Sequence, residues 1–278
     1  MQKAFDIDGP AQLEIRLASG DIEIDPTLDG RVEVELTAHD EESQRFVDEA
    51  RVEQNGRQVT VDVPQRRGGF SFSIFGRSGI TCRVRCPEGS SLSARTKSAD
   101  TTARGTLGAL SVQTASGDVS ARTVTGGLSV KSASGDITVE HVGGGVNAQT
   151  ASGDVSIVSV RGPVNAQSAS GDVEIEEAYD NVNATVVSGD LSLGAVMTGD
   201  VHAQAVSGDV TIGVRRGSRV FLDCNTLSGD TSSELELQTD APDGAGPLVE
   251  IRAKTVSGDI RITRAPAPVN DDAQEVHA

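Results

Sequence analysis

Residues 152–169 read SGDVSIVSV followed by RGPVNAQSA, and this pair of nonapeptides decides the fold. Each nonapeptide has glycine second, an aliphatic residue fourth, an aliphatic residue or alanine sixth, and another apolar residue ninth. Strand residues two apart share a face, so Val155 and Ile157 should point inward while Ser156 faces water. Glycine supplies the positive φ that a corner needs. We therefore predict an 18-residue coil of two short strands and two turns, with a three-sided coil as the alternative.

The Ser-Gly-Asp triplet repeats along most of the chain. It begins nine times, and from Ser116 to Ser188 the step is 18 residues every time. Such fixed self-similarity is typical of a solenoid, in which each coil buries its apolar face against its neighbours. The sequence thus predicts an all-β, right-handed β-solenoid with a small β-rich insertion and one short helix near the N-terminus.

Two known solenoid classes fit this period less well. Hexapeptide-repeat acyltransferases also use 18-residue coils, but here Val155 and Val164 are nine residues apart and nothing apolar recurs at six. Calcium-binding nonapeptide rolls need aspartate in both turns of the coil, whereas the second turn here carries Gly127, Gly145, Pro163 or Asn181. We therefore expect no metal and no other cofactor.

The chain divides into four regions. A first coil should occupy residues 1–25, an inserted capping or interaction region residues 26–88, the main solenoid residues 89–264, and a disordered acidic tail residues 265–278. Within the insertion we predict a strand at 32–38 and a helix at 41–50 capped by Asp40. A hairpin should turn at Asn55-Gly56, and the last triplet, at Ser257, should close the stack.

The composition limits the partners. The formal charge of −17 argues against nucleic acid, and no hydrophobic run approaches membrane-spanning length. Three cysteines suggest thiols rather than disulfides, and Cys82 and Cys86 share one strand face that should be buried. The first residues lack the apolar segment of a signal peptide, so we expect a cytoplasmic protein.

The repeated Ser-Gly-Asp-Val pattern, together with residues 84–92 (VRCPEGSSL), resembles the bacterial β-strand-repeat domains labelled "putative adhesin", a family of unknown function. The resemblance covers about residues 10–264. It implies a β-solenoid with no established catalytic residues.

One aspartate from each triplet should stack into a column along an edge of the solenoid. Neighbouring carboxylates ~4.8 Å apart repel by about 0.9 kcal/mol each even in water. We expect each carboxylate to accept a backbone N–H in its own turn, which would offset that repulsion. The alternative is an edge that binds cations or a basic partner. The column consists of Asp118, Asp136, Asp154, Asp172, Asp190, Asp209 and Asp230.

We predict no enzyme and no catalytic residues. A column of equivalent carboxylates lacks the differing pair that a glycosidase needs. His141 and His202 should face solvent without partners in matching register, and Ser-Gly-Asp is not the nucleophile elbow of hydrolases.

One stretch breaks the composition: residues 65–78 (QRRGGFSFSIFGRS) combine three phenylalanines with three arginines. Either they cover an open end of the solenoid, or they bind a protein partner with aromatic anchors and a basic rim. The candidate partner-binding residues are Arg66, Arg67, Phe70, Phe72, Ile74, Phe75 and Arg77.

The functional hypothesis is a non-enzymatic interaction or scaffold protein that binds a protein partner, of unknown identity, through its insertion. We expect a monomer or weak self-association. The alternatives are a self-assembling, filament-like structural protein and an adhesin-like surface-binding module.

Overall fold

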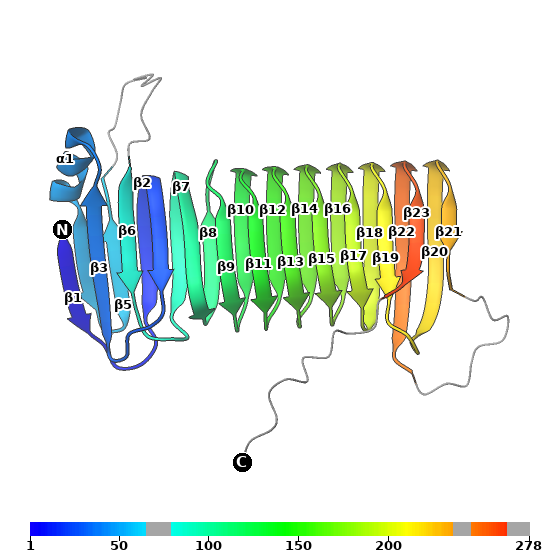
Figure 1. Cartoon of the computed structure of the whole chain (residues 1–278), viewed down its shortest axis with the longest axis horizontal. Coiled ribbons are helices and arrows are strands. Elements are labelled where there is room, and N and C mark those ends of the chain that lie inside the picture. The colour runs from blue at the N-terminus through cyan, green and yellow to red at the C-terminus, as the bar shows by residue number, and fades with distance from the viewer. Residues whose placement is uncertain (65–78, 236–245, 266–278) are drawn as a thin grey trace, which may run out of the picture.

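The computed structural model describes residues 1–64, 79–235 and 246–265. It confirms the all-β solenoid: parallel strands stack side by side along a rod, with the chain reversing at each corner (Figure 1). Helix α1 (Glu41–Glu49) lies at the N-terminal end of the rod. No helix among the described residues has the length and apolarity to cross a bilayer.

Each regular coil has two strands, as predicted. In one coil these are β12 (Val146–Ser152) and β13 (Val155–Val160), and in the next β14 (Val164–Ser170) and β15 (Val173–Ala178). Val146 pairs with Val164 and Val155 with Val173, so equivalent residues stack at the repeat spacing. The same pattern includes β8 (Ala109–Gln113), β9 (Val119–Val124), β10 (Leu128–Ser134), β11 (Ile137–Val142), β16 (Val182–Ser188) and β17 (Leu191–Val196).

The core follows the fourth and sixth positions of each nonapeptide. Val155, Ile157 and Ala166 are all buried. The ninth position behaves differently in the two halves. Val160 is buried because the β13 register skips a residue before Ser159, whereas Ala169 is exposed because Ser168 takes the inward position. The ninth position therefore lies inside only in the first nonapeptide.

The triplet glycines are required by contact between coils as well as by φ. Gly171 has φ +136°, and a Cβ there would lie 2.3 Å from the carbonyl oxygen of Gly153. Gly135 has no positive φ, yet its Cβ would lie 2.2 Å from the Gly117 oxygen. The corner is thus too close to the preceding coil for any side chain.

The insertion builds the N-terminal end. Strand β2 (Gln12–Asp25) pairs on one side with β7 (Ser91–Leu107), and on the other with β5 (Gln58–Asp62) and β6 (Ile80–Arg85). Beyond these lie the antiparallel strands β1 (Gln2–Asp6), β3 (Arg31–Ala38) and β4 (Arg51–Asn55). The insertion therefore adds an outer coil and then ends the parallel stacking.

The local predictions for the insertion are confirmed. The strand at 32–38 is β3, and the Asp40 carboxylate accepts the Ser43 N–H at 2.7 Å at the start of α1. Strands β4 and β5 form an antiparallel hairpin in which Asn55 pairs with Gln58.

The C-terminal end has an exchanged coil order. Strands β18 (Gly199–Ser207) and β19 (Val210–Val214) are followed in sequence by β20 (Arg219–Ser228) and β21 (Thr231–Ser233). In space, however, β22 (Leu248–Ser257) and β23 (Ile260–Arg264) fill the position between them. The triplet at Ser257 therefore does not close the stack; the coil at Ser228 does.

Candidate interaction surface

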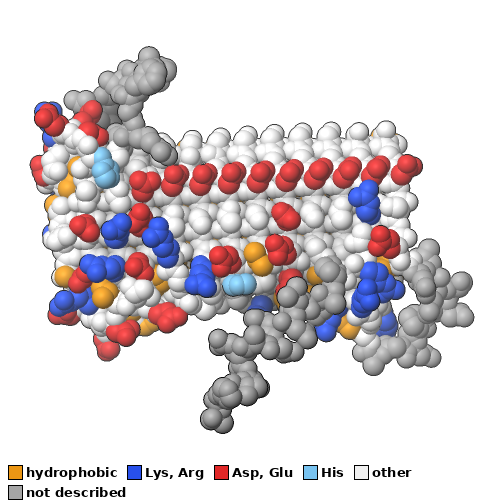
Figure 2. Space-filling model, viewed as in Figure 1, with side chains coloured by type: hydrophobic (Ala, Val, Ile, Leu, Met, Phe, Trp, Pro, Cys, Tyr) orange, Lys and Arg blue, Asp and Glu red, His pale blue; other side chains and the backbone are white. Residues whose placement is uncertain are grey.

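The aspartate column is a hydrogen-bonded ladder between coils, visible as one row of acidic side chains along the rod (Figure 2). Oδ1 of Asp136 accepts the backbone N–H of Asp154 at 2.9 Å, and the Asp154 carboxylate accepts that of Asp172 at 2.8 Å. The expected acceptor role is present, but the donor lies in the next coil rather than in the aspartate's own turn. The ladder runs, in spatial order, through Asp100, Asp118, Asp136, Asp154, Asp172, Asp190, Asp209, Asp259 and Asp230.

This geometry gives the column a structural role in the coils from Asp100 to Asp259, because each of these carboxylates satisfies an N–H at a corner where the backbone would otherwise lack a partner. Among the described residues, no three His, Cys, Asp or Glu side chains come together in a way that could hold a metal ion.

The partner-binding residues predicted from sequence, Arg66, Arg67, Phe70, Phe72, Ile74, Phe75 and Arg77, lie outside the described residues. The strands that flank them, β5 and β6, are both described, and β6 forms one wall of the groove described below.

The cysteines are thiols placed as expected. Cys82 and Cys86 are buried on one face, and burial raises the pKa of Cys82 to about 12 and that of Cys86 to about 11. Burial also raises the pKa of Cys224. A thiol with a raised pKa carries little thiolate at neutral pH, so none of the three is prepared for nucleophilic or metal chemistry.

One histidine of the regular coils lies next to a serine. His141 Nδ1 lies 2.9 Å from Ser159 Oγ, which corrects the expectation that His141 has no partner in register. A triad needs a carboxylate behind the histidine. Here Glu177 pairs with Ser159 on the side away from His141, and its Oε2 accepts the Tyr179 hydroxyl at 2.9 Å. Within the described part of the chain, no carboxylate hydrogen-bonds the His141 ring, so no acidic group there orients it as a general base for Ser159.

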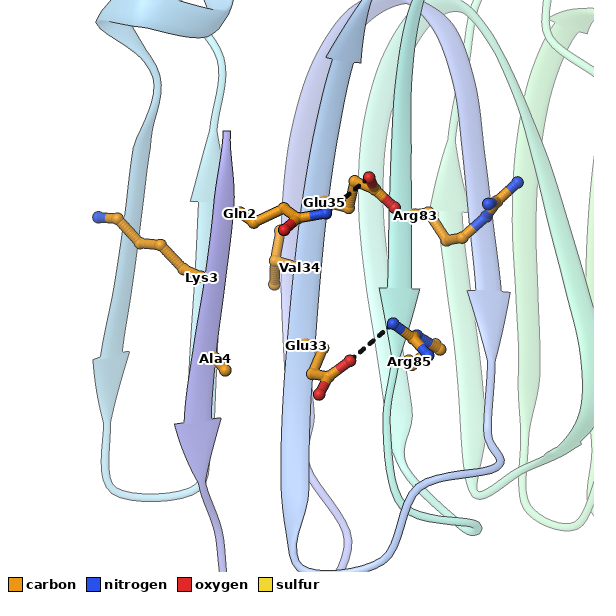
Figure 3. A pocket seen from close by; sticks show the side chains of 8 residues that line it. All are labelled: Gln2, Lys3, Ala4, Glu33, Val34, Glu35, Arg83 and Arg85. Atoms are coloured by element: carbon orange, nitrogen blue, oxygen red, sulfur yellow. Dashed lines mark hydrogen bonds and ion pairs between the residues drawn. The ribbon is translucent and has the colours of Figure 1, made fainter.

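A groove crosses the outer face of the N-terminal end, where β1, from the region predicted as the first coil, pairs with β3 of the insertion. It is a hollow of about 230 Å³ lined by β1, β3 and β6 (Figure 3). The small side chain of Ala4 lies between Gln2 and Asp6 on the edge strand, which leaves room above the sheet. The lining residues are Gln2, Lys3, Ala4, Glu33, Val34, Glu35, Arg83 and Arg85.

Both charge signs meet in this groove. Arg85 forms an ion pair with Glu33 at 2.8 Å, and Gln2 donates to the Glu35 carboxylate at 2.8 Å. Arg83 pairs with Glu23 at 2.8 Å just beyond the rim. The arginines are about half-exposed, so their remaining donors face solvent. Arginine is enriched at protein–protein interfaces, so the exposed guanidinium donors make this groove a candidate binding surface.

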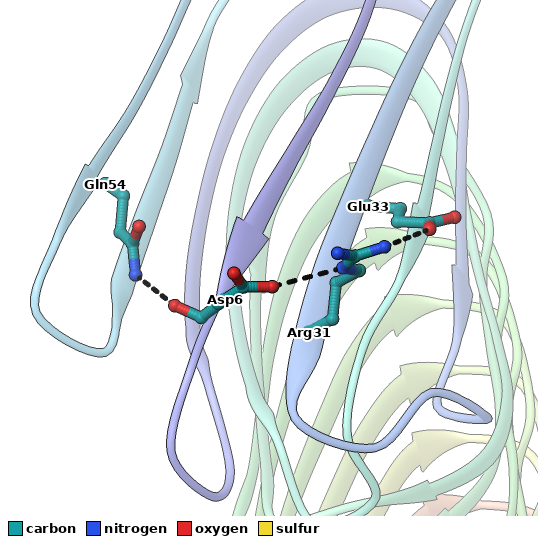
Figure 4. A network of polar contacts seen from close by, with 4 residues as sticks. All are labelled: Asp6, Arg31, Glu33 and Gln54. Atoms are coloured by element: carbon teal, nitrogen blue, oxygen red, sulfur yellow. Dashed lines mark hydrogen bonds and ion pairs between the residues drawn. The ribbon is translucent and has the colours of Figure 1, made fainter.

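The same strands close the end of the rod. Lys3 Nζ donates to the Val52 carbonyl at 2.8 Å, and Gln54 Nε2 donates to the Asp6 carbonyl at 2.9 Å. Because β1 is the edge of one face and β4 the edge of the other, these bonds link the two edges. Arg31 extends the network to Asp6 at 3.2 Å and to Glu33 at 3.9 Å (Figure 4).

A second surface was missed by the sequence analysis. The exposed ninth position of the second nonapeptide is alanine in the middle of the rod but becomes larger toward the C-terminal end. Val187, Val206, Val256 and Leu227 lie side by side in register on four adjacent strands and are 45–82 % exposed. Val206, Val256 and Leu227 border a hollow of about 320 Å³. The increase from alanine to valine to leucine is readable in the sequence, but the sequence alone does not show that this position faces solvent.

Comparisons with known proteins agree with the fold. A family model described as Toastrack DUF4097 matches residues 11–263. None of the curated proteins matches the sequence.

Several solved structures are similar over most of their length. One is described as a "putative adhesin" from Bacteroides fragilis, 14 % identical, with 94 % of this chain and 96 % of that chain covered and a TM-score of 0.41. Another is described as a "putative lipid binding protein" from Parabacteroides distasonis, 12 % identical, with 95 % and 96 % covered and a TM-score of 0.46. At these values the likeness carries no argument about function.

Proposed function

We propose that this chain, which belongs to the Toastrack DUF4097 family, is an adhesin-like, non-enzymatic interaction module. In this proposal it binds a protein partner through its N-terminal insertion. The repeats form a rigid support, and the insertion provides the binding face. The observation that carries the proposal is the groove over β1, β3 and β6. There, paired arginines and carboxylates surround the space that the small side chain of Ala4 leaves open.

The surface chemistry of the regular coils supports this assignment. Their corners repeat the same Ser-Gly-Asp unit, whose carboxylates already accept backbone N–H groups of neighbouring coils. A binding site for one partner needs a surface that occurs once. The insertion provides such a surface, since antiparallel strands and α1 occur there together with the irregular charge pattern.

The filament-like alternative is less well supported. Stacking coils end to end requires two open, matching ends, whereas the N-terminal end is closed by antiparallel strands and by bonds from Lys3 and Gln54. For the compartment, we propose the cytoplasm, because Cys82, Cys86 and Cys224 are unpaired thiols.

Photo-crosslinking in cells that make the protein tests the proposal. A photoreactive amino acid at Gln2, on the groove, should yield a discrete adduct with one protein. The same amino acid at Thr138, an exposed outward position of β11, should yield none. Equal adducts at both positions, or none at Gln2, would refute partner binding through the insertion.

Two variants refine the test. Arg85→Glu places like charges beside Glu33 and should lower the adduct yield at Gln2, whereas Thr138→Glu should not. Phe72→Ser changes the aromatic segment at 65–78 and should lower the yield without changing the melting temperature. A lower melting temperature would show instead that Phe72 supports the fold.

A further inference from the structure

The C-terminal end of the rod, unlike the N-terminal end, finishes on a coil of parallel strands whose outer edge is unpaired within the described part of the chain. Strand β20 pairs only with β22, and β21 only with β23 (Figure 1). The aspartate ladder also ends here: the Asp230 N–H donates to Asp259 at 2.8 Å, and no described coil follows to donate to the Asp230 carboxylate.

The inward side chains of β20 are incompletely covered. Val220, Leu222 and Cys224 stand opposite Val249, Ile251 and Ala253 of β22. The three β22 residues have no exposed surface, whereas their β20 counterparts are only partly buried. Phe221 is 56 % exposed on the outward face of the same strand.

The other strand of this coil, β21, carries polar residues at the inward positions. Thr231 and Ser233 of β21 stand opposite Ile260 and Ile262, so polar residues replace the aliphatic ones of the coil before. Strand β20 keeps its apolar residues at the equivalent depth. An apolar strand with an unpaired edge is a template for pairing with another chain.

The occupant can be argued from the two ends of the rod. A second copy cannot add its N-terminal end in a coil-on-coil stack, because antiparallel strands β1 and β4 close that end. Like ends can meet only through a two-fold axis, which makes a closed dimer rather than a fibre. A two-fold axis normal to the sheet pairs β20 with its own copy in antiparallel sense.

The sequence of β20 complements itself in one such register. The axis keeps outward residues on the outward face, so the two residues of each pair must both be odd-numbered or both be even-numbered. Centred on Phe221, the register places Arg219 opposite Asp223 of the second copy twice, and Phe221 opposite itself. On the inner face it places Val220 opposite Leu222. Centred on Asp223 instead, it would oppose two carboxylates.

We propose that two copies of this chain join tail to tail through β20, in an antiparallel pairing centred on Phe221, to form one rod of double length. The pairing satisfies the unpaired edge, covers the half-buried residues Val220 and Leu222, and forms two Arg219–Asp223 pairs. It is independent of partner binding at the N-terminal groove, which it leaves free at both ends of the dimer.

The test is the absolute mass of the full-length chain by light scattering over a wide concentration range. We expect the mass to rise from 28.7 kDa to twice that value and then stop. Asp223→Arg places an arginine opposite Arg219 of the other copy at both pairs, and the like charges should weaken dimerisation at least about tenfold. Adding Arg219→Asp to Asp223→Arg reverses both signs and should restore it. A monomer at every concentration, a mass that climbs beyond the dimer, or a double variant no better than the single one would overturn the proposal.

A disulfide test does not depend on those charges. It also leaves Arg219 unchanged, so the hydrogen bond from Arg219 to the Gly246 carbonyl does not affect its result. In a Cys224→Ser background, Phe221→Cys places a thiol at the axis and should give a covalent dimer under mild oxidation. Asn225→Cys lies on the same outward face, away from the axis, and should remain monomeric on a denaturing gel. Equal cross-linking of both, or none at Phe221→Cys, would exclude this register.

Discussion

The backbone N–H of Asp172 donates to Oδ1 of Asp154 at 2.8 Å, so the side chain of one coil binds the main chain of the next. The same bond recurs along the rod, for example from Asp190 to Asp172 at 2.7 Å. It explains how a row of carboxylates is tolerated at the repeat spacing, because each one except the terminal Asp230 gains a charge-assisted hydrogen bond that offsets repulsion from its neighbours.

Substitutions at Asp154 separate the hydrogen bond from the charge. Asp154→Asn keeps an acceptor oxygen for the Asp172 N–H and removes one repulsive charge, so stability should change little. Asp154→Ala removes the acceptor and should cost about 1 kcal/mol. Urea unfolding measures both, with Ser156→Ala as an outward-facing control. Equal losses for Asn and Ala would show that the charge, not the bond, matters.

The corner glycines should be intolerant of any side chain. Gly171→Ala places Cβ 2.3 Å from the Gly153 carbonyl oxygen at φ +136°, and should cost at least about 3 kcal/mol from strain and overpacking. Gly56→Ala is the matched control: it also has positive φ, at +61°, but nothing lies within 4 Å of its Cβ. A similar loss of melting temperature in both variants would mean that φ alone is limiting.

The cap of α1 should make part of the stability depend on pH. Hydrogen bonds from Ser43 lower the pKa of Asp40 below its usual value, so the ionised cap stabilises the fold above that value. This contribution is lost as the pH falls through the lowered pKa. Asp40→Ala should lower the melting temperature at pH 7, and its difference from wild type should shrink in acid.

Asp40→Asn is the control, because it keeps a capping oxygen but cannot titrate. It should retain most of the melting temperature at pH 7. An Asp40→Ala difference that is constant down to acid pH would contradict the assigned role of the carboxylate.

Thiol reactivity should follow burial. Burial raises the pKa values of Cys82 and Cys86 to about 12 and 11, so neither should react with a disulfide reagent in the native protein at pH 8. Cys224, only partly buried, should react slowly. All three should react at once in denaturant. Rapid native labelling of Cys82 would show that the insertion opens.

The repeat could be predicted from sequence because its signals are local. Alternation of Val155, Ser156 and Ile157 defines a strand face, and Asn55-Gly56 defines a hairpin, whatever the rest of the chain does. The N-terminal groove was not predicted, because its lining residues come from β1, β3 and β6, which are far apart in sequence.

The order of coils at the two ends could not be predicted for a related reason. The sequence pattern of each coil predicts that the coil stacks on another. Because the coils are nearly identical in sequence, the pattern does not predict which coil becomes its neighbour. Thus β22 lies between β18 and β20, although β20 comes first in the chain. Similarly, the carboxylate of Asp154 was expected to bond within its own turn, since the sequence alone gives no distance to the next coil.

The central claim is that the aspartate column serves the fold and that binding belongs to the insertion. The most direct test is the photo-crosslinking yield at Gln2 in a variant carrying asparagine at Asp118, Asp136, Asp154, Asp172 and Asp190 together. The account predicts an unchanged melting temperature and an unchanged yield of the discrete adduct. A folded variant that has lost the adduct would contradict it and assign partner recognition to the column.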